Sequence, residues 1–179
     1  MRTATIELMP GTELTIPVEE YNETLAWCRA YRKIAERQRD EQHVFRMVDV
    51  GASCGVFAAF AAIRWPYAYL DCYEASDARR RIALLNVQPG TRVLAELPQV
   101  LPACDGLRVA GNVRLHELDG ESLGKLRVCL WEFASDVVFD SVSSLMRAIG
   151  MSLVHVATVD SGPPARGLML WIRRKDKHP

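Results

Sequence analysis

The stretch Val48-Asp49-Val50-Gly51-Ala52-Ser53-Cys54-Gly55 decides the fold of this chain. The apolar and β-branched residues at positions 44–50 predict a strand, and the glycines that follow predict a tight turn. Residues 56–63 are apolar and rich in alanine and stop at Trp65-Pro66, so they predict a buried helix. Residues 69–74 then predict a second strand. Strand, turn, helix and strand in this order are typical of a parallel sheet with crossover helices.

The rest of the chain continues this alternation, although residues 91–112 show no readable pattern. Two further helices are predicted at residues 77–87 and 137–149, and four further strands at residues 113–118, 127–133, 153–159 and 167–173. The last two strands are joined by Ser161-Gly162-Pro163-Pro164, which predicts a hairpin. We therefore predict a three-layer α/β fold, in which a mostly parallel sheet has an antiparallel C-terminal edge.

The N-terminal part of the chain has a pattern of its own. Two β-prone runs at residues 3–8 and 12–18 are divided by a Pro-Gly pair and predict a hairpin. Residues 19–40 place apolar side chains at helical spacing, with glutamates early and arginines late, as the helix dipole favours. We expect residues 1–43 to form a hairpin and an amphipathic helix that cap a site or make a dimer contact, ahead of a main domain at residues 44–179.

The composition of the 179 residues argues against several classes of protein. The 22 basic and 22 acidic residues cancel, so no overall charge draws the chain to nucleic acid or to an anionic membrane. No apolar run is long enough for a membrane span and no signal peptide is visible, which favours a cytoplasmic protein. The five cysteines include no C-x-x-C pair and the four histidines are scattered, so neither a disulfide framework nor a metal site is predicted. We expect a small-molecule partner, with a homodimer as an open option.

An acidic residue, Glu74, lies 19 positions after Gly55 at the end of the second predicted strand. In parallel sheets of this kind, glycines let the backbone approach a ligand beyond the strand ends, and such an acid accepts hydrogen bonds from ribose hydroxyls. The dinucleotide pattern G-x-G-x-x-G has Ser53 and Val56 where its later glycines belong, which argues against NAD and FAD. No P-loop lysine follows Gly55, which argues against ATP and GTP. A ribose-bearing ligand without phosphates remains, and S-adenosyl-L-methionine is the common one.

These motifs resemble those of the class I S-adenosylmethionine-dependent methyltransferases, and most of all the FkbM-type O-methyltransferases. The opening stretch is similar to that group's first motif, Tyr73-Glu74-Ala75 to its second, and Leu84-Leu85-Asn86 to the end of the next helix. Two later parts of the chain match the family more weakly. Leu118-Asp119 is similar to its leucine–aspartate pair, and residues 128–136 are similar to the end of one of its strands. The resemblance implies a Rossmann-like methyltransferase fold with these cofactor-binding residues: Asp49, Gly51, Ala52, Ser53, Gly55, Glu74 and, on the adenine side, Asp119.

The resemblance also implies roles for the residues of the site. Residues 51–55 are expected to wrap the methionine portion of the cofactor, Asp49 to orient that loop or the amino group, and Glu74 to hold the ribose. Glu132 and Asp136 are the candidate catalytic acids, and Glu132 is placed to take a proton from a hydroxyl. No Asn/Asp-Pro-Pro-Tyr/Phe sequence follows the fourth predicted strand. Methyl transfer to an oxygen of a small molecule or a sugar is therefore expected, rather than transfer to an amine.

Each of these residues also has a purely structural interpretation. Glu132 is equally a strand-end carboxylate, and for Asp136 we favour the cap of the helix that starts near residue 137. Cys54 is either a packed thiol or a reactive one at a helix N-terminus, and packing is favoured. The run Arg79-Arg80-Arg81 is expected to be the solvated face of a helix.

Two other functions remain open. The pattern around Glu132-Phe133-Ala134 departs from the methyltransferase motif, so a non-catalytic methyltransferase-like binding or scaffold protein is the first alternative. Residues 51–55 also satisfy the serine-hydrolase pattern G-x-S-x-G, although few strands precede this turn. That second alternative makes Ser53 the nucleophile, with its partners among Asp136, Asp160, His155 and His178.

Overall fold

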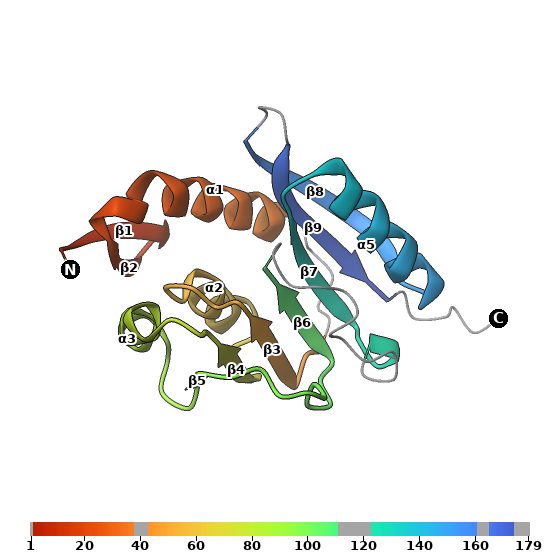
Figure 1. Cartoon of the computed structure of the whole chain (residues 1–179), viewed down its shortest axis with the longest axis horizontal. Helices are drawn as coiled ribbons and strands as arrows, with labels where there is room; N and C mark the ends of the chain where they lie inside the picture. The colour runs from red at the N-terminus through yellow and green to blue at the C-terminus, as the bar shows by residue number, and fades with distance from the viewer. Residues whose placement is uncertain (1, 38–42, 111–122, 161–164, 174–179) are drawn as a thin grey trace.

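The computed structural model describes residues 2–37, 43–110, 123–160 and 165–173. Within these residues a seven-stranded sheet forms the centre of the molecule, with strand order β5-β4-β3-β6-β7-β9-β8 (Figure 1). The strands are β3 (Arg46–Val50), β4 (Tyr69–Tyr73), β5 (Arg92–Leu94), β6 (Gly106–Val109), β7 (Val128–Phe133), β8 (Ser152–Asp160) and β9 (Arg166–Ile172). Strands β3 to β7 pair in parallel, and β9 runs antiparallel to both β7 and β8. The predicted sheet with an antiparallel C-terminal edge is confirmed.

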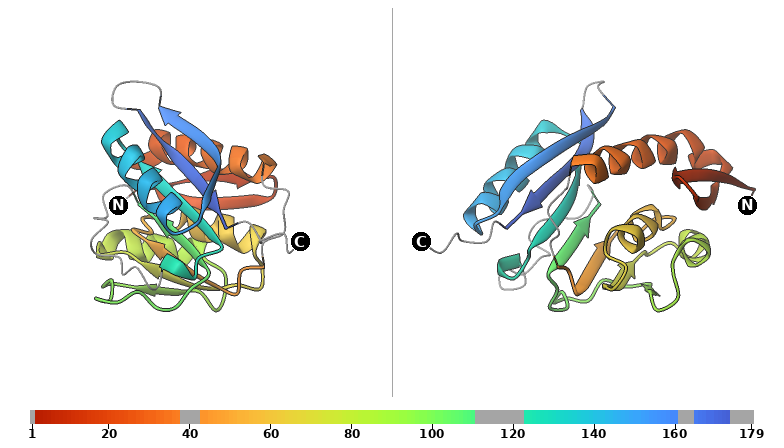
Figure 2. Two further views of the ribbon diagram at one scale, coloured as in Figure 1. Left: turned by 90° about the vertical axis from the view of Figure 1, so that its right-hand side faces the viewer. Right: turned by 180° about the vertical axis from the view of Figure 1, so that it is seen from behind.

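Helices cover both faces of this sheet and give the predicted three layers (Figures 1 and 2). Successive residues of a strand point to opposite faces, so Met47 and Val48 of β3 join two different hydrophobic clusters. The cluster of Met47 is covered by α1 (Tyr21–Arg37), α2 (Val56–Arg64) and α3 (Asp77–Asn86). The cluster of Val48 is covered by α5 (Asp136–Ala148).

Serine side chains cap two of these helices. The hydroxyls of Ser76 and Ser135 accept hydrogen bonds from the backbone N–H groups of Arg79 and Val138, at 3.4 and 3.3 Å. The prediction that Asp136 caps α5 is therefore wrong, because the cap is Ser135 and the helix begins one residue earlier than expected. The carboxylate of Asp136 lies exposed on the first turn, where its negative charge interacts favourably with the positive end of the helix dipole.

The N-terminal hairpin of β1 (Thr3–Met9) and β2 (Thr12–Pro17) packs into the same hydrophobic cluster as α1 and α2. A short 3-10 turn, η1 (Val18–Glu20), leads from the hairpin into α1. Asn86, the last residue of α3, fastens the hairpin. Its amide donates to the carbonyls of Thr15 and Cys54, both at 2.6 Å, and its side-chain oxygen accepts from the N–H of Thr15 at 2.7 Å. One side chain thus joins the hairpin, α3 and the glycine-rich turn.

The stretch at residues 91–112, which showed no readable pattern, contains β5 and β6. Since β6 inserts between β3 and β7, β7 is the fifth strand of the sheet along the chain, not the fourth. The position after the fourth strand is therefore Ala110-Gly111-Asn112, and it has no Pro-Pro pair either. The predicted strand at residues 113–118 lies outside the described residues. No helix in the described part of the chain has the length and apolar character needed to cross a membrane.

Candidate functional site

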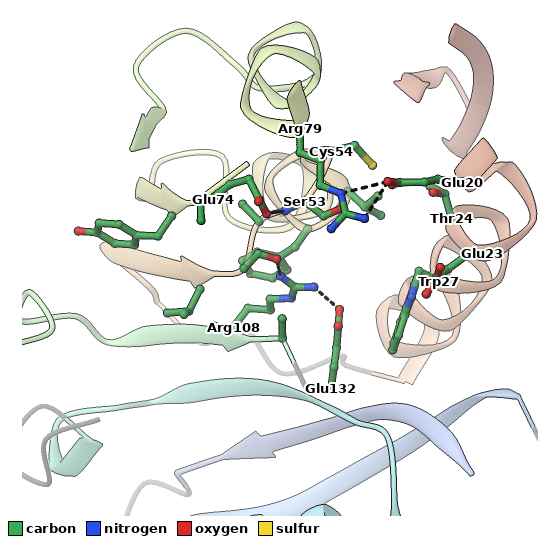
Figure 3. Close-up of a pocket in the computed structure, with 18 of the residues that line it drawn as sticks. Glu20, Glu23, Thr24, Trp27, Ser53, Cys54, Glu74, Arg79, Arg108 and Glu132 are labelled. Atoms are coloured by element: carbon green, nitrogen blue, oxygen red, sulfur yellow. Dashed lines mark hydrogen bonds and ion pairs between the residues drawn. The ribbon is translucent and has the colours of Figure 1, made fainter. Parts of the chain in front are cut away.

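A cavity of about 600 Å³ opens at the carboxyl ends of the parallel strands (Figure 3). The ends of β3, β4, β6 and β7 form its floor, and α1 forms the wall opposite the glycine-rich turn. After β3 the chain adds strands on one side, and after β5 it returns to add β6 and β7 on the other. Open α/β sheets bind their ligands at such a reversal of strand order. The topology therefore marks this cavity as the candidate site.

The turn that follows β3 has a backbone shape that favours glycine. Gly51, Ser53 and Gly55 have φ angles of 79°, 51° and 85°, all in the left-handed region. At Gly55 a side chain would also meet α3, because a Cβ there would lie 3.3 Å from the Cα of Ala83. Gly55 is needed for the helix to approach the turn, and Ser53 holds a conformation that a serine rarely adopts.

Glu74 joins this turn to the end of β4. Its two carboxylate oxygens accept hydrogen bonds from the N–H groups of Ser53, at 2.8 Å, and Ser76, at 2.9 Å. The N–H of Ala52 donates to the carbonyl of Tyr73 at 2.9 Å, which fixes the turn a second time. Glu74 is 9% exposed and lines the cavity. Each carboxylate oxygen has a second lone pair, so Glu74 can still accept hydrogen bonds from a ligand.

A buried cluster of charges lies where β3, β6 and β7 run side by side. Arg108 of β6 donates through Nη1 to Oδ1 of Asp49, at 2.8 Å, and to the carbonyl of Gly51, at 2.6 Å. Its Nη2 donates to Oε1 of Glu132. Asp49 is fully buried, and Arg108 and Glu132 are 6% and 9% exposed. Because two carboxylates share one guanidinium, the cluster carries one net negative charge when both acids are ionised.

The members of this cluster have different access to the cavity. Arg108 and Glu132 line it, whereas Asp49 lies behind them. Burial raises the pKa of Asp49 from 3.8 to about 6, and the charge of Arg108 limits that rise. Burial alone would lower the pKa of Arg108, but the charge of Glu132 and the other neighbouring groups raises it well above its ordinary value. Asp49 therefore orients a permanently charged Arg108, and Glu132 is the acid that a ligand would meet.

The wall formed by the N-terminal helix is tied to the rest of the molecule by two ion pairs. Glu20 of η1, directly before the helix, binds Arg79 of α3 at 2.8 Å (Figure 3). Glu23 of α1 binds Arg166 of β9 at 2.9 Å. The guanidinium of Arg166 also lies 5.9 Å from the ring centre of Trp27, in cation–π geometry. Arg79 is exposed on α3, as expected for a solvated helix face, and its side chain also lines the cavity and binds Glu20 there.

The structure brings most of the predicted site residues together and leaves others aside. Those that line the cavity are Gly51, Ala52, Ser53, Glu74 and Glu132. Asp49 and Gly55 lie behind the lining and shape it from there. Asp136 does not line the cavity, so the structure does not group it with Glu132. Asp119 lies outside the described residues.

The serine-hydrolase alternative finds no support in this geometry. No histidine of the described residues lines the cavity beside Ser53, and His155 is on β8 at the far edge of the sheet. His178 lies outside the described residues. Cys54 is 2% exposed and burial raises the pKa of its thiol, as expected for a packed cysteine rather than a reactive one.

Three side chains of the cavity, Arg108, Tyr31 and Trp27, were not identified as site residues from the sequence. Arg108 falls in a strand of four residues, too short to show a period of two. Its one available signal is a lone arginine inside the apolar run Leu107 to Val109. Tyr31 and Trp27 fall within residues 19–40, where the pattern of hydrophobicity predicts a helix, and the hydroxyl of Tyr31 gives no signal in such a pattern.

No protein-family model and no curated protein sequence matches this chain. Solved structures are similar to it. The precorrin-6y C5,15-methyltransferase of Geobacter metallireducens GS-15 has a TM-score of 0.63 and 13% identity, over 80% of this chain and 87% of that one. The magnesium protoporphyrin IX methyltransferase of Synechocystis PCC 6803 with bound SAM has a TM-score of 0.58 and 11% identity, over 87% and 82%. With bound SAH, its TM-score is 0.56 at 12% identity, over 89% of each chain. At such identities the likeness concerns the fold, and this chain has the Rossmann-like fold of S-adenosylmethionine-dependent methyltransferases.

Proposed function

We propose that this protein is an S-adenosyl-L-methionine-dependent methyltransferase. One observation carries the proposal: the left-handed turn after β3 and the carboxylate of Glu74 meet in the cavity, joined by the 2.8 Å hydrogen bond from Ser53. They meet where the strand order reverses. The fold supports the same conclusion, and the sequence pattern disfavours the nucleotides that carry phosphates.

The residues of the cavity fit this cofactor. Gly51 and the left-handed turn bring backbone rather than bulky side chains to the ligand, and Glu74 has lone pairs left for ribose hydroxyls. The net negative charge of the Asp49–Arg108–Glu132 cluster suits a ligand that carries an ammonium and a sulfonium. Asp119 on the adenine side stays part of the proposal on the strength of its sequence motif alone.

The proposed reaction is transfer of a methyl group to an oxygen of a small molecule or a sugar. When bound, the cofactor supplies a methyl group that is already activated by its positive sulfur. The chain then has to hold an acceptor in line and remove its proton. Glu132 is the acid best placed for that proton, because protonation there brings the net charge of its cluster to zero. Asp136 takes no part in this proposal, since it does not line the cavity.

The N-terminal helix is proposed as the cap of the site. It lines the cavity through Glu23, Thr24, Trp27 and Tyr31, and Glu20 of the preceding turn η1 lines it as well. Asn86 and the shared hydrophobic cluster hold the hairpin and helix to the rest of the fold. One cavity lined by both Glu132 and α1 is what a methyltransferase needs for its acceptor, and this supports catalysis over the scaffold alternative.

Calorimetric titration with S-adenosylmethionine and its demethylated product tests the proposal. The unmodified protein is expected to bind both. Glu74→Ala is expected to weaken binding about tenfold or more, because each hydrogen bond to a charged group is worth ~1.5 to 3 kcal/mol. Glu74→Gln is the matched control that keeps the shape and one acceptor oxygen, so its loss should be smaller. If the unmodified protein binds neither ligand, the proposal is wrong.

A further inference from the structure

One residue of the N-terminal helix that lines the cavity, Tyr31, has a buried polar atom without a hydrogen-bond partner among the described residues. This atom is the hydroxyl oxygen, and Tyr31 as a whole is 1% exposed. Its ring packs against Phe57 and Phe60, with centroid distances of 6.0 and 5.0 Å. A phenylalanine would make the same ring contacts without burying an unsatisfied hydroxyl, which costs stability. Packing alone therefore does not account for this hydroxyl.

The surroundings of the hydroxyl are those of the charged cluster. Burial raises the pKa of Tyr31 well above its ordinary value. The guanidinium of Arg108, which lies beside the hydroxyl, lowers this pKa, and the charges of Glu132 and Asp49 raise it. The phenol is therefore neutral at neutral pH and has a hydrogen to donate. Two other buried atoms of the cluster, Nε of Arg108 and Oδ2 of Asp49, also have no partner among the described residues. Unsatisfied polar atoms gathered in this way point to a polar group that belongs there.

The order of the strands gives the cavity two ends. The turn after β3 and Glu74 of β4 form one end, and Arg108 of β6 and Glu132 of β7 form the other. Figure 3 shows Glu74 and Glu132 on opposite sides of Arg108, with α1 facing the side of Glu132. Under the proposed function the first end holds the cofactor. The second end, whose Arg108 and Glu132 act on the Tyr31 hydroxyl, is then left for the acceptor.

We propose that Tyr31 is a catalytic residue whose hydroxyl donates a hydrogen bond to the acceptor oxygen during methyl transfer; this inference rests on the proposed function. The acceptor oxygen forms its bond to the methyl carbon with one lone pair, while the carbon–sulfur bond breaks and its electron pair stays on sulfur. The proton of the acceptor hydroxyl passes to Glu132. Tyr31 keeps its own proton and, through its hydrogen bond, directs a free lone pair of the oxygen toward the methyl group.

Tyr31→Phe tests this role without an identified acceptor. Sinefungin, which carries an amine in place of the methyl sulfonium group, presents a polar group at the position of the methyl. The phenol oxygen of Tyr31 is expected to accept a hydrogen bond from that amine. Tyr31→Phe should therefore weaken sinefungin about five- to tenfold while S-adenosylhomocysteine binds within about twofold of the unmodified protein. Because an unpaired hydroxyl is removed, the urea midpoint should stay equal or rise.

Tyr21→Phe is the matched control, since Tyr21 lies on the same helix, is 39% exposed and does not line the cavity. It should change neither affinity. A Tyr31→Phe variant that is less stable, or that affects the two ligands equally, overturns the inference while the proposed function stands. If the unmodified protein binds neither ligand, the proposed function itself fails and the role of Tyr31 fails with it.

Discussion

Two aspartates on neighbouring strands sit beside arginines and respond in opposite ways. Asp49 of β3 shares the buried Arg108 with Glu132, and its pKa is raised to about 6. Asp71 of β4 binds Arg46 at 3.0 Å and Arg92 at 2.6 Å, two side chains that are 41% and 59% exposed, and its pKa is lowered. Both carboxylates are themselves buried.

The difference comes from the number of guanidinium groups for each acid. Burial acts to raise the pKa of Asp71, but two arginines bind both of its oxygens and outweigh that effect. At Asp49 one guanidinium is divided between two acids and Oδ2 has no partner, so burial prevails. The cluster of Asp71, Arg46 and Arg92 thus holds β3, β4 and β5 together. The Asp49 cluster instead maintains a negative charge at the cavity, at a cost in stability.

Removing one arginine from each cluster should give the largest difference in stability between the two clusters. Arg108→Gln leaves two buried acids without a cation, so it should lower the free energy of unfolding by ~3 to 5 kcal/mol at pH 7. The loss should shrink at pH 5, because Asp49, whose pKa burial raises to about 6, then takes up a proton. Arg46→Gln is the control and should cost at most ~1 kcal/mol, because its side chain is 41% exposed. Urea unfolding at both pH values measures this, and equal losses in the two variants would remove the distinction.

Local sequence was enough to predict most of the sheet. The runs that became β3 and β4 are apolar and bounded by glycine or proline, so their ends were predicted to within two residues. β5 and β6 were missed because strands of three and four residues are too short to show a periodic pattern. Their place in the sheet follows from register with longer neighbours, which a single sequence does not display.

The candidate site divides in the same way. The turn after β3 and Glu74 were predicted because the residues of the turn are consecutive in the sequence and Glu74 follows them at a fixed spacing. Arg108 is 59 positions from Asp49 and 24 from Glu132, and only the pairing of β6 with β3 and β7 brings the three together. Helical spacing offered Tyr31 or Ile34 as an apolar position of the helix, but the place of the Tyr31 hydroxyl depends on the packing of α1 over that sheet.

The two aspartates should also differ in the pH dependence of stability. The folded pKa of Asp49, about 6, lies above its ordinary value of 3.8, so its contribution is complete below about pH 4 and is lost as pH rises through 6. That change amounts to ~3 kcal/mol at ~1.4 kcal/mol for each tenfold change in proton affinity. Asp71→Asn should show the opposite sign, because a lowered pKa contributes stability that is lost only as pH falls below 3.8.

Asp49→Asn is the variant that isolates this effect. Arg108, Glu132 and Glu74 also face Asp49 and influence its charge, so the quantity to compare is the stability of the unmodified protein minus that of the variant. This difference should fall by ~3 kcal/mol between pH 4 and pH 7 in urea unfolding. A difference that stays constant over this range would show that Asp49 titrates as an ordinary carboxylate.

The smallest expected effect is that of salt on the coupling energy between an arginine and an aspartate. This effect should again differ between the Asp71 and Asp49 clusters. A double-mutant cycle of Arg46→Gln and Asp71→Asn is expected to give a coupling of ~0.5 kcal/mol at 0.1 M salt, since the 3.0 Å pair is partly exposed. At 1 M salt the screening length falls to ~3 Å, so this coupling should approach zero. The same cycle with Arg108→Gln and Asp49→Asn should keep most of its value, because the two side chains are only 7% and 0% exposed and buried pairs are screened much less. If the coupling between Arg108 and Asp49 also decays with salt, then solvent and ions reach this pair at the cavity floor. Asp49 would then respond to its surroundings in the same way as Asp71.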